Sequence, residues 1–411
     1  MLVERNPRDG AAGDKSSSEL ERLLSEAVAD CQKREQTAFD AHSGAAHAPI
    51  VLLGAGQLGR RTLRALERVG RPAVAVADNN AALWGTEVEN VRVYSPAEAA
   101  SRFGKVATFV VSIWRAGGTH RYEQSRRQLH ALGCERITSI APLAWKYAEA
   151  MLPHYCLDLP HRVLEEAASV RAAFGLLGDA RSRLEYRAQL RFRLLADFDC
   201  LPHPDQEPQY LADGLFAYSD DEDFVDGGAY NGDTLRSYLS SRDRFASYTA
   251  LEPDPPNFEA LQRYVSSLPS DVASRIELLA LAAYSSRQRM RIAWSGSAAA
   301  ALVAADGPPD PNDVECVTLD ELFAGRRMSF LKLDIEGAEP DAITGAAAVI
   351  RRDRPIIAVC VYHLQNHLWR IPLLIASLVG DYRFHLRPYN EEGWDLVCYA
   401  VPRERSLTSG E

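Results

Sequence analysis

Two stretches of the chain share a pattern of a short apolar run, a glycine-rich turn and an amphipathic segment. Residues 49–70 read PIVLLGAGQLGRRTLRALERVG, and residues 224–240 read FVDGGAYNGDTLRSYLS. A short apolar run bounded by turn residues is typical of a buried parallel strand, and apolar residues three or four positions apart indicate a helix. The pattern therefore predicts two α/β domains, each with a strand–turn–helix unit near its start.

The C-terminal half continues this pattern with six more apolar runs. Three of them, those that begin at 248, 329 and 355, lead into a helical pattern, as expected where parallel strands alternate with helices. The last two have no helix between them and are typical of the antiparallel end of a sheet. In chain order they begin YTALEPDPPNFEAL (248–261), IELLALAAYSS (276–286), SFLKLDIEGAEPDAITGA (329–346), PIIAVCVYH (355–363), YRFHLRPYN (382–390) and WDLVCYAVP (394–402).

Changes in this pattern divide the chain into five parts. The part before the second α/β domain is helical in pattern, and it either covers a ligand pocket as a lid or braces the two domains. The first helix either docks on its own domain or serves dimerisation. The predicted parts are 1–47, an N-terminal helix with a partly disordered start; 48–145, a Rossmann-like domain; 146–220, the helical connector; 221–403, the second α/β domain; and 404–411, a tail.

The turn at residues 226–234 combines glycines with acidic side chains. Gly227, Gly228 and Gly232 carry no side chains, so the backbone can approach a ligand closely. Asp226 and Asp233 stand where a phosphate-binding loop offers lysine, and no GxxxxGK[ST] motif is present. The turn therefore suits a ligand that is cationic or rich in hydroxyl and amino groups.

Further acidic residues follow the ends of the next strands. In doubly wound sheets the acid that ends the second strand holds ribose hydroxyls, and Glu252 occupies that place. Asp334, Glu336 and Glu339 follow a later strand and point to the same edge of the sheet. Lys332 shares its side of that strand with Asp334, and we expect it to pair with a nearby carboxylate.

The ordered blocks DGGAYNGDT, LEPDPPNF, LKLDIEGAE, VYH and YRFHLRPYN resemble the FkbM family of S-adenosylmethionine-dependent methyltransferases. The resemblance covers roughly residues 221–403. It implies a class I methyltransferase fold, which is a seven-stranded, mostly parallel sheet with one antiparallel strand near its edge. It also implies O-methylation of hydroxyls on sugars, polyketides or related natural products. The donor fits the acidic turn because it carries an ammonium, a sulfonium and a ribose.

The strand ends and this resemblance together give a predicted binding site for the cofactor. The glycine turn is expected to hold the methionine part and Glu252 the ribose. Adenine is expected near the third strand, at Ala283 and Tyr284. The full predicted set is Asp226, Gly227, Gly228, Tyr230, Gly232, Asp233, Thr234, Glu252, Pro253, Ala283, Tyr284 and Asp334.

Methyl transfer to a hydroxyl benefits from a base that removes the proton as the new bond forms. Asp334 and His363 are the predicted catalytic residues, because both follow strands at the ligand edge. Alternatively, Asp334 binds the methionine amino group of the donor, and His363 is a structural group. Tyr210, before the core, either lines the pocket or packs beneath it.

No metal site is predicted for this edge of the sheet. Asp334, Glu336 and Glu339 are weak candidates for holding Mg²⁺, which would orient a diol acceptor. Carboxylates are nevertheless common at such strand ends without any metal.

The N-terminal turn matches a dinucleotide fingerprint. Gly54, Gly56 and Gly59 follow a strand and open a helix, and Asp78 ends the next strand. These residues form a possible second site for NAD(P) or a nucleotide-sugar, which would make the enzyme bifunctional. The same glycines also occur for packing or oligomerisation alone, and no Tyr-x-x-x-Lys pair follows. A third alternative is a non-catalytic scaffold in which both domains serve assembly.

Composition narrows the partners and the compartment. The formal charge of −10 leaves no basic surplus for nucleic acid. The seven cysteines form no CxxC pair, so neither a disulfide framework nor a zinc site is indicated. No signal peptide and no apolar run of the ~18 residues that span a bilayer is visible. We expect a cytoplasmic protein with a small-molecule acceptor, no membrane partner, and possible homodimer formation.

Overall fold

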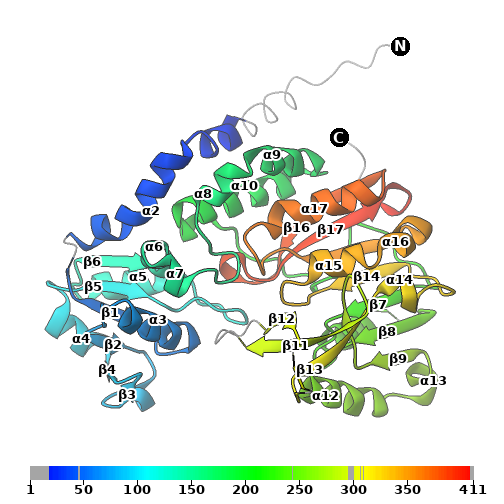
Figure 1. The fold of residues 1–411 in the computed structure, drawn as a ribbon, viewed down its shortest axis with the longest axis horizontal. Coiled ribbons are helices and arrows are strands. Elements are labelled where there is room, and N and C mark those ends of the chain that lie inside the picture. Colours follow the sequence, from blue (N-terminus) through cyan, green and yellow to red (C-terminus); the bar gives the residue numbers. More distant parts are fainter. Residues whose placement is uncertain are drawn as a thin grey trace.

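The chain folds around two main β-sheets that lie side by side (Figure 1). The computed structural model describes residues 18–407 except 45–46, 243, 295–299, 306 and 309. The predicted partly disordered start, residues 1–17, lies outside the described residues. No helix of the described part is long and apolar enough to cross a membrane.

The N-terminal domain contains a six-stranded sheet in the order β3-β4-β2-β1-β5-β6. All neighbouring strands pair in parallel except β3 and β4, which agrees with the predicted Rossmann-like pattern. The strands are β1 (Ile50–Leu53), β2 (Ala75–Ala77), β3 (Glu87–Val88), β4 (Val91–Tyr94), β5 (Thr108–Val111) and β6 (Arg136–Ser139), with helices α3 (Gln57–Arg68), α4 (Pro96–Phe103) and α5 (Tyr122–Ala131).

The C-terminal domain contains a seven-stranded sheet in the order β16-β17-β15-β14-β7-β8-β9. Only β17 runs antiparallel to its neighbours, which confirms the predicted class I architecture. The strands are β7 (Asp223–Gly227), β8 (Ser247–Leu251), β9 (Ile276–Leu279), β14 (Phe330–Leu333), β15 (Ile356–Cys360), β16 (Tyr382–Pro388) and β17 (Leu396–Pro402). The helices are α11 (Asp233–Ser241), α12 (Pro255–Ser266), α13 (Ser270–Ala273), α14 (Leu319–Leu322), α15 (Glu339–Thr344), α16 (Ala347–Asp353) and α17 (His367–Leu378).

A smaller four-stranded sheet, which the sequence pattern does not predict, stands beside β9. The run at 276–286 is expected to be one strand, but it divides after β9, and its second half joins this other sheet. The sheet has the order β10-β13-β11-β12, formed by β10 (Ala282–Ala283), β11 (Gln288–Trp294), β12 (Ala300–Ala304) and β13 (Asp313–Val317).

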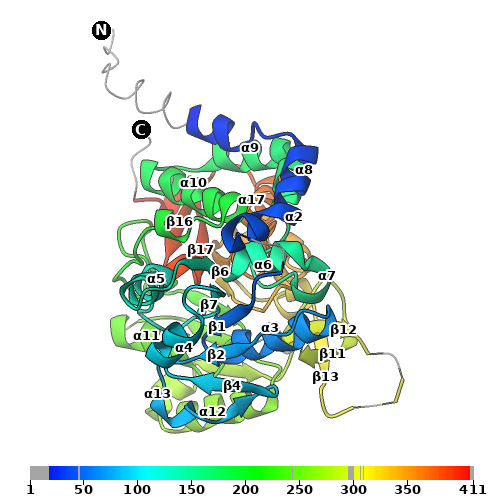
Figure 2. The same cartoon turned by 90° about the vertical axis from the view of Figure 1, so that its left-hand side faces the viewer.

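The helical connector packs mainly against the C-terminal domain. Helix α9 contacts α17, and α10 contacts β16, so these helices cover the end of the sheet where its antiparallel strand lies (Figure 2). The long N-terminal helix α2 contacts both α6 and α8 and thereby ties the N-terminal domain to the helical connector. The bounds are α2 (Val28–Ser43), α6 (Ile140–Lys146), α7 (Ala148–Met151), α8 (His161–Glu165), α9 (Ala167–Leu176) and α10 (Ala180–Leu195).

The centre of the C-terminal sheet is held by stacked aromatic rings. Phe224 on β7 stacks on Tyr248 of β8 at 4.8 Å and on Phe330 of β14 at 4.5 Å. All three side chains are buried. Large aromatic side chains contribute much of a core's burial energy, and their contact fixes the register of the three central strands. This register brings the ends of β7, β8 and β14 together at one edge.

Candidate functional site

A cavity of about 450 Å³ opens at this edge, beside the carboxyl ends of β7, β8 and β14. Eight of the residues predicted to bind the cofactor line this cavity, namely Gly228, Tyr230, Asp233, Thr234, Glu252, Pro253, Ala283 and Asp334. The other predicted residues, Asp226, Gly227, Gly232, Tyr284 and His363, do not line it. The lining also includes residues that the sequence does not assign to the cofactor, among them Gln209, Tyr210, Leu281, Ile292, Glu336 and Asp395.

The glycine turn lies tightly against the end of β14. Gly228 has a φ of +78°, and a Cβ there would overlap the carbonyl oxygen of Asp334. The backbone N–H groups of Gly228 and Ala229 both donate to the carbonyl oxygen of Leu251, at 3.0 Å each. These two donors are therefore occupied, unlike the free amides that hold an anion in a phosphate-binding loop.

Asp226 lies beneath the turn and is fully buried. Its carboxylate accepts a hydrogen bond from the Tyr248 hydroxyl (2.6 Å) and lies 2.9 Å from the ammonium of Lys332. That ammonium also donates to the carbonyl oxygens of Gly227 (3.2 Å) and Gly228 (2.5 Å). Burial opposes the charge, but the Asp226 carboxylate raises the pKa of Lys332 above its usual range. This confirms the expected carboxylate partner of Lys332, and the pair fixes the turn from below.

Glu252, at the end of β8, connects the turn to the cavity wall. Its carboxylate accepts the backbone N–H groups of Tyr230 (2.8 Å) and Asp254 (2.9 Å). Burial raises the pKa of Glu252, and the two backbone donors work against that shift. The side chain thus has a fixed orientation at the cavity, in the place expected of a ribose-binding acid.

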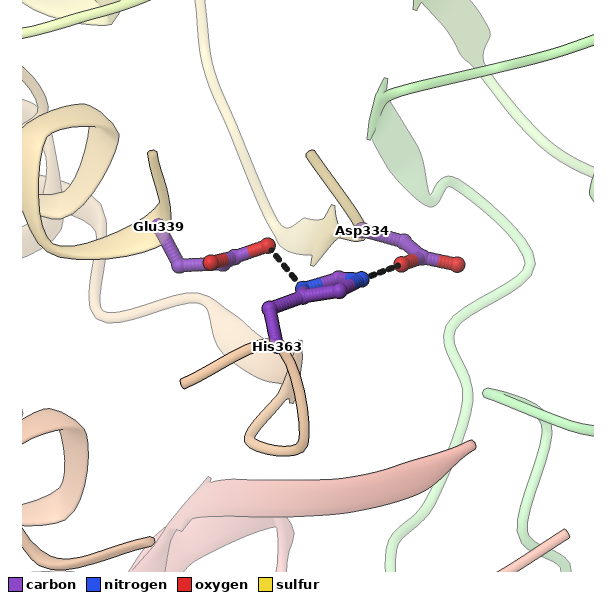
Figure 3. A group of neighbouring side chains, drawn as sticks. All are labelled: Asp334, Glu339 and His363. Atoms are coloured by element: carbon purple, nitrogen blue, oxygen red, sulfur yellow. Dashed lines mark hydrogen bonds and ion pairs between the residues drawn. The ribbon is translucent and has the colours of Figure 1, made fainter. Parts of the chain in front are cut away.

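Three ionisable side chains form a chain at the far end of the site (Figure 3). The imidazole of His363 lies between two carboxylates, with Nδ1 2.7 Å from Glu339 and Nε2 3.2 Å from Asp334. The second Asp334 oxygen accepts the hydroxyl of Tyr210 at 2.7 Å. His367 lies 3.3 Å from the second oxygen of Glu339.

The position of His363 between two carboxylates determines the protonation states of these side chains. Burial opposes a charge on His363, but Glu339 and Asp334 raise its pKa well above the usual value. Burial likewise works to raise the pKa of Asp334, yet the His363 imidazolium holds that pKa below its usual range. His363 is therefore an imidazolium held between two carboxylates, and it does not reach the cavity surface.

The positions of these side chains indicate whether they could coordinate a metal ion. Asp334, Glu339 and His363 lie close enough to hold one ion. However, the two carboxylates are on opposite sides of the imidazole, and both ring nitrogens face a carboxylate (Figure 3). One oxygen of Glu339 also accepts the backbone N–H of Ile335 at 2.9 Å. The donor atoms thus form a row of ion pairs and do not surround a common point.

Glu336 has properties that the sequence does not reveal. It lines the cavity with a φ of +56°, and its carboxylate lies 3.7 Å from Nε2 of His363. Burial raises the pKa of Glu336 to about 7; the charge of His363 works against this shift, and the charges of Asp334 and Glu339 add to it. In the sequence, Glu336 is marked only by its place two residues after Asp334, at the end of a strand. That place does not distinguish a metal ligand from a base.

The residues predicted to form a site at the N-terminal glycine turn make hydrogen bonds and packing contacts within the turn itself. The carboxylate of Asp78 accepts the backbone N–H groups of Ala55 and Asn80, both at 2.7 Å. A Cβ at Gly59 would overlap the carbonyl oxygen of Gly54, so these two glycines are required by strand–helix packing. Gly56 has open space around it. A site for NAD(P) or a nucleotide-sugar at this turn stays a prediction.

Comparison with known proteins identifies the C-terminal domain. Residues 226–387 match the family model described as the methyltransferase FkbM domain. These residues form an FkbM methyltransferase domain. No curated protein matches the chain. The chain therefore contains a methyltransferase domain of the FkbM type, which favours an enzyme over a scaffold.

Solved structures show how far the fold extends beyond the FkbM domain. The crystal structure of a methyltransferase FkbM from Methylobacillus flagellatus KT is similar with a TM-score of 0.74 and 20% identity, covering 95% of this chain and 99% of that chain. The N-terminal domain therefore belongs to the shared fold. The structure of LepI in complex with SAM matches with 13% identity over 74% of this chain and 78% of that chain. Its TM-score of 0.25 is too low to indicate a shared fold.

The Asp226–Lys332 pair gives a stability prediction. Replacing Asp226 by Ala leaves the Lys332 ammonium buried without its carboxylate, so the free energy of unfolding should fall by about 3–5 kcal/mol. Urea unfolding followed by circular dichroism measures it. Glu259→Ala, which breaks an exposed pair with Arg263 on α12, should change stability little. Equal losses in the two variants would contradict the structural role of Asp226.

Proposed function

We propose that the FkbM domain transfers a methyl group from S-adenosylmethionine to a hydroxyl group of a small sugar or other natural-product acceptor. The observation that carries this proposal is the cavity itself. Its lining joins the glycine turn and Glu252 at one end to Asp334 and Glu336 at the other. A donor and an acceptor can therefore meet in one cavity, held close to each other.

The donor fits the first end of the cavity. Glu252 is placed to accept hydrogen bonds from ribose hydroxyls, and Asp233 lies where the methionine ammonium would be neutralised. Apolar side chains of Leu281, Ala283 and Ile292 form a surface for the adenine ring. The occupied amides of the glycine turn also favour a cationic donor over a phosphate.

The acceptor would occupy the end that Asp334, Glu336 and Asp395 line. In the proposed step the acceptor oxygen forms a bond to the methyl carbon while the sulfur–carbon bond breaks and its electron pair stays on sulfur. The hydroxyl proton passes to Glu336, whose raised pKa suits a base near neutral pH. Asp334 orients the acceptor or the donor ammonium, and the buried His363 holds Asp334 in place.

The reaction itself is tested by mass spectrometry of mixtures that contain enzyme, S-adenosylmethionine and a panel of sugar and polyketide alcohols. We expect one acceptor to gain a single methyl group, and NMR of the product should place it on oxygen. S-adenosylhomocysteine must form in the same amount. A product methylated only on nitrogen or carbon would contradict the hydroxyl assignment.

Glu252 should control donor affinity. Hydrogen bonds to a charged group contribute about 1.5–3 kcal/mol, so Glu252→Ala should raise the Kd of S-adenosylhomocysteine at least about tenfold in isothermal titration calorimetry. Glu252→Gln retains one oxygen and should lie between. The control is Glu277→Ala on β9, an exposed residue paired with Arg326 at 2.7 Å. Equal affinities for Glu252→Ala and the control would refute the ribose assignment.

Glu336 should set the pH dependence of catalysis. A general base acts only when deprotonated, so kcat/KM should rise with pH and level off above the Glu336 pKa of about 7. Glu336→Gln should remove this rise and lower the plateau by about 10²–10⁴-fold. The matched control is Glu321→Gln, a half-exposed residue on α14. An unchanged profile in Glu336→Gln would transfer the base role to another group.

A further inference from the structure

The loop between β16 and β17, residues 390–395, forms part of the acceptor end of the cavity through Asp395. Three of its residues have left-handed backbone: Glu392 (φ +57°), Gly393 (φ +86°) and Asp395 (φ +49°). Residues other than glycine adopt this conformation less often, so contacts with the surroundings help to hold it, above all at Glu392. The contacts that fix the loop therefore decide where Asp395 lies.

Much of that contact comes from the N-terminal domain. The indole N–H of Trp114, in the segment after β5, donates to the carbonyl oxygen of Glu392 at 3.1 Å. The Glu392 carboxylate accepts the backbone N–H of Tyr122, the first residue of α5, where the helix dipole favours an anion. The Arg121 side chain lies 2.5 Å from the carboxylate of Glu391.

Aromatic packing extends this contact to Tyr362, the neighbour of His363 in the sequence. The ring of Trp114 lies 5.1 Å from that of Trp394, which in turn lies 4.4 Å from Tyr155 and 5.8 Å from Tyr362. Tyr362 directly precedes His363, and both tryptophans are buried. Within the loop, the Asn390 amide donates to the Asp395 carboxylate at 3.2 Å. The N-terminal domain thus reaches the cavity through one indole and one helix end.

We infer that Trp114 and the N-terminus of α5 are positioning groups for methyl transfer, because they hold the 390–395 loop and place Asp395 against the acceptor. The N-terminal domain is then a part of the acceptor site. The Gly54–Gly59 turn needs no ligand for this role. The inference rests on the proposed function, since that function defines the acceptor end of the cavity.

The test uses the full-length protein in two variant pairs. Trp114→Ala is compared with Trp84→Ala, which removes a half-exposed tryptophan from the same domain. Glu392→Ala is compared with Glu392→Gln, whose amide oxygen still accepts the Tyr122 N–H. We expect Trp114→Ala and Glu392→Ala to raise the acceptor KM at least tenfold, with a smaller change in kcat. The Kd of S-adenosylhomocysteine should stay within twofold, and the Trp84→Ala and Glu392→Gln variants should resemble the wild type.

A second measurement needs no acceptor. Hydrogen–deuterium exchange in the presence of S-adenosylhomocysteine should accelerate at least tenfold at residues 390–396 in Trp114→Ala and stay unchanged at 227–234. Should Trp114→Ala fail to fold, Trp114→Phe and the Glu392 pair decide the question. Unchanged exchange and KM, or equal losses of donor and acceptor affinity, would overturn the inference. Failure of the wild type to bind S-adenosylhomocysteine would instead overturn the proposed function.

Discussion

The ammonium of Lys332 joins the central strand of the C-terminal sheet to the glycine turn. It sits in a buried position on β14, with Asp226 on one side and the carbonyl oxygens of Gly227 and Gly228 on the other. Moving an ammonium out of water costs several kcal/mol unless it is paired, and here one carboxylate and two carbonyl oxygens surround it. The turn is therefore held in its curved form before any ligand arrives, and this side of the cavity is preorganised.

From this cation the charges alternate across the site. Asp226 and Lys332 are followed by Asp334, then by the imidazolium of His363, and then by Glu339. Each charge lies next to one of opposite sign, so each is stabilised despite its burial. Glu336 is the additional carboxylate in a group that already carries three carboxylates against two cations. Burial, with the neighbouring carboxylates adding to it, raises the pKa of Glu336 to about 7. The site thus contains a carboxylate whose pKa lies near neutrality beside a row of paired charges.

The sequence is sufficient to predict the sheet and the edge at which Glu252 and Asp334 meet, because the carboxyl ends of parallel strands share one edge. It does not show that Asp226 lies beneath the turn, since that depends on its buried pairing with Lys332, 106 positions later. Glu336 is also hidden, because its pKa arises from neighbours brought together by folding. Asp395 and Trp114 belong to segments whose contact no local periodicity can reveal.

The two glycine turns also show why an acid at the second strand end is not enough to define a binding site. Asp78 accepts the backbone N–H groups of Ala55, in its glycine turn, and of Asn80. Glu252 likewise accepts those of Tyr230, in the other glycine turn, and of Asp254. The difference lies in what surrounds them. Beside Glu252, the β10–β13 sheet supplies Ala283 and Ile292 as a wall of the cavity, whereas the described strands of the N-terminal domain form one sheet alone. The same strand–turn–helix unit therefore lines a cavity in one domain, while in the other its hydrogen bonds maintain the fold of a domain that contacts the 390–395 loop.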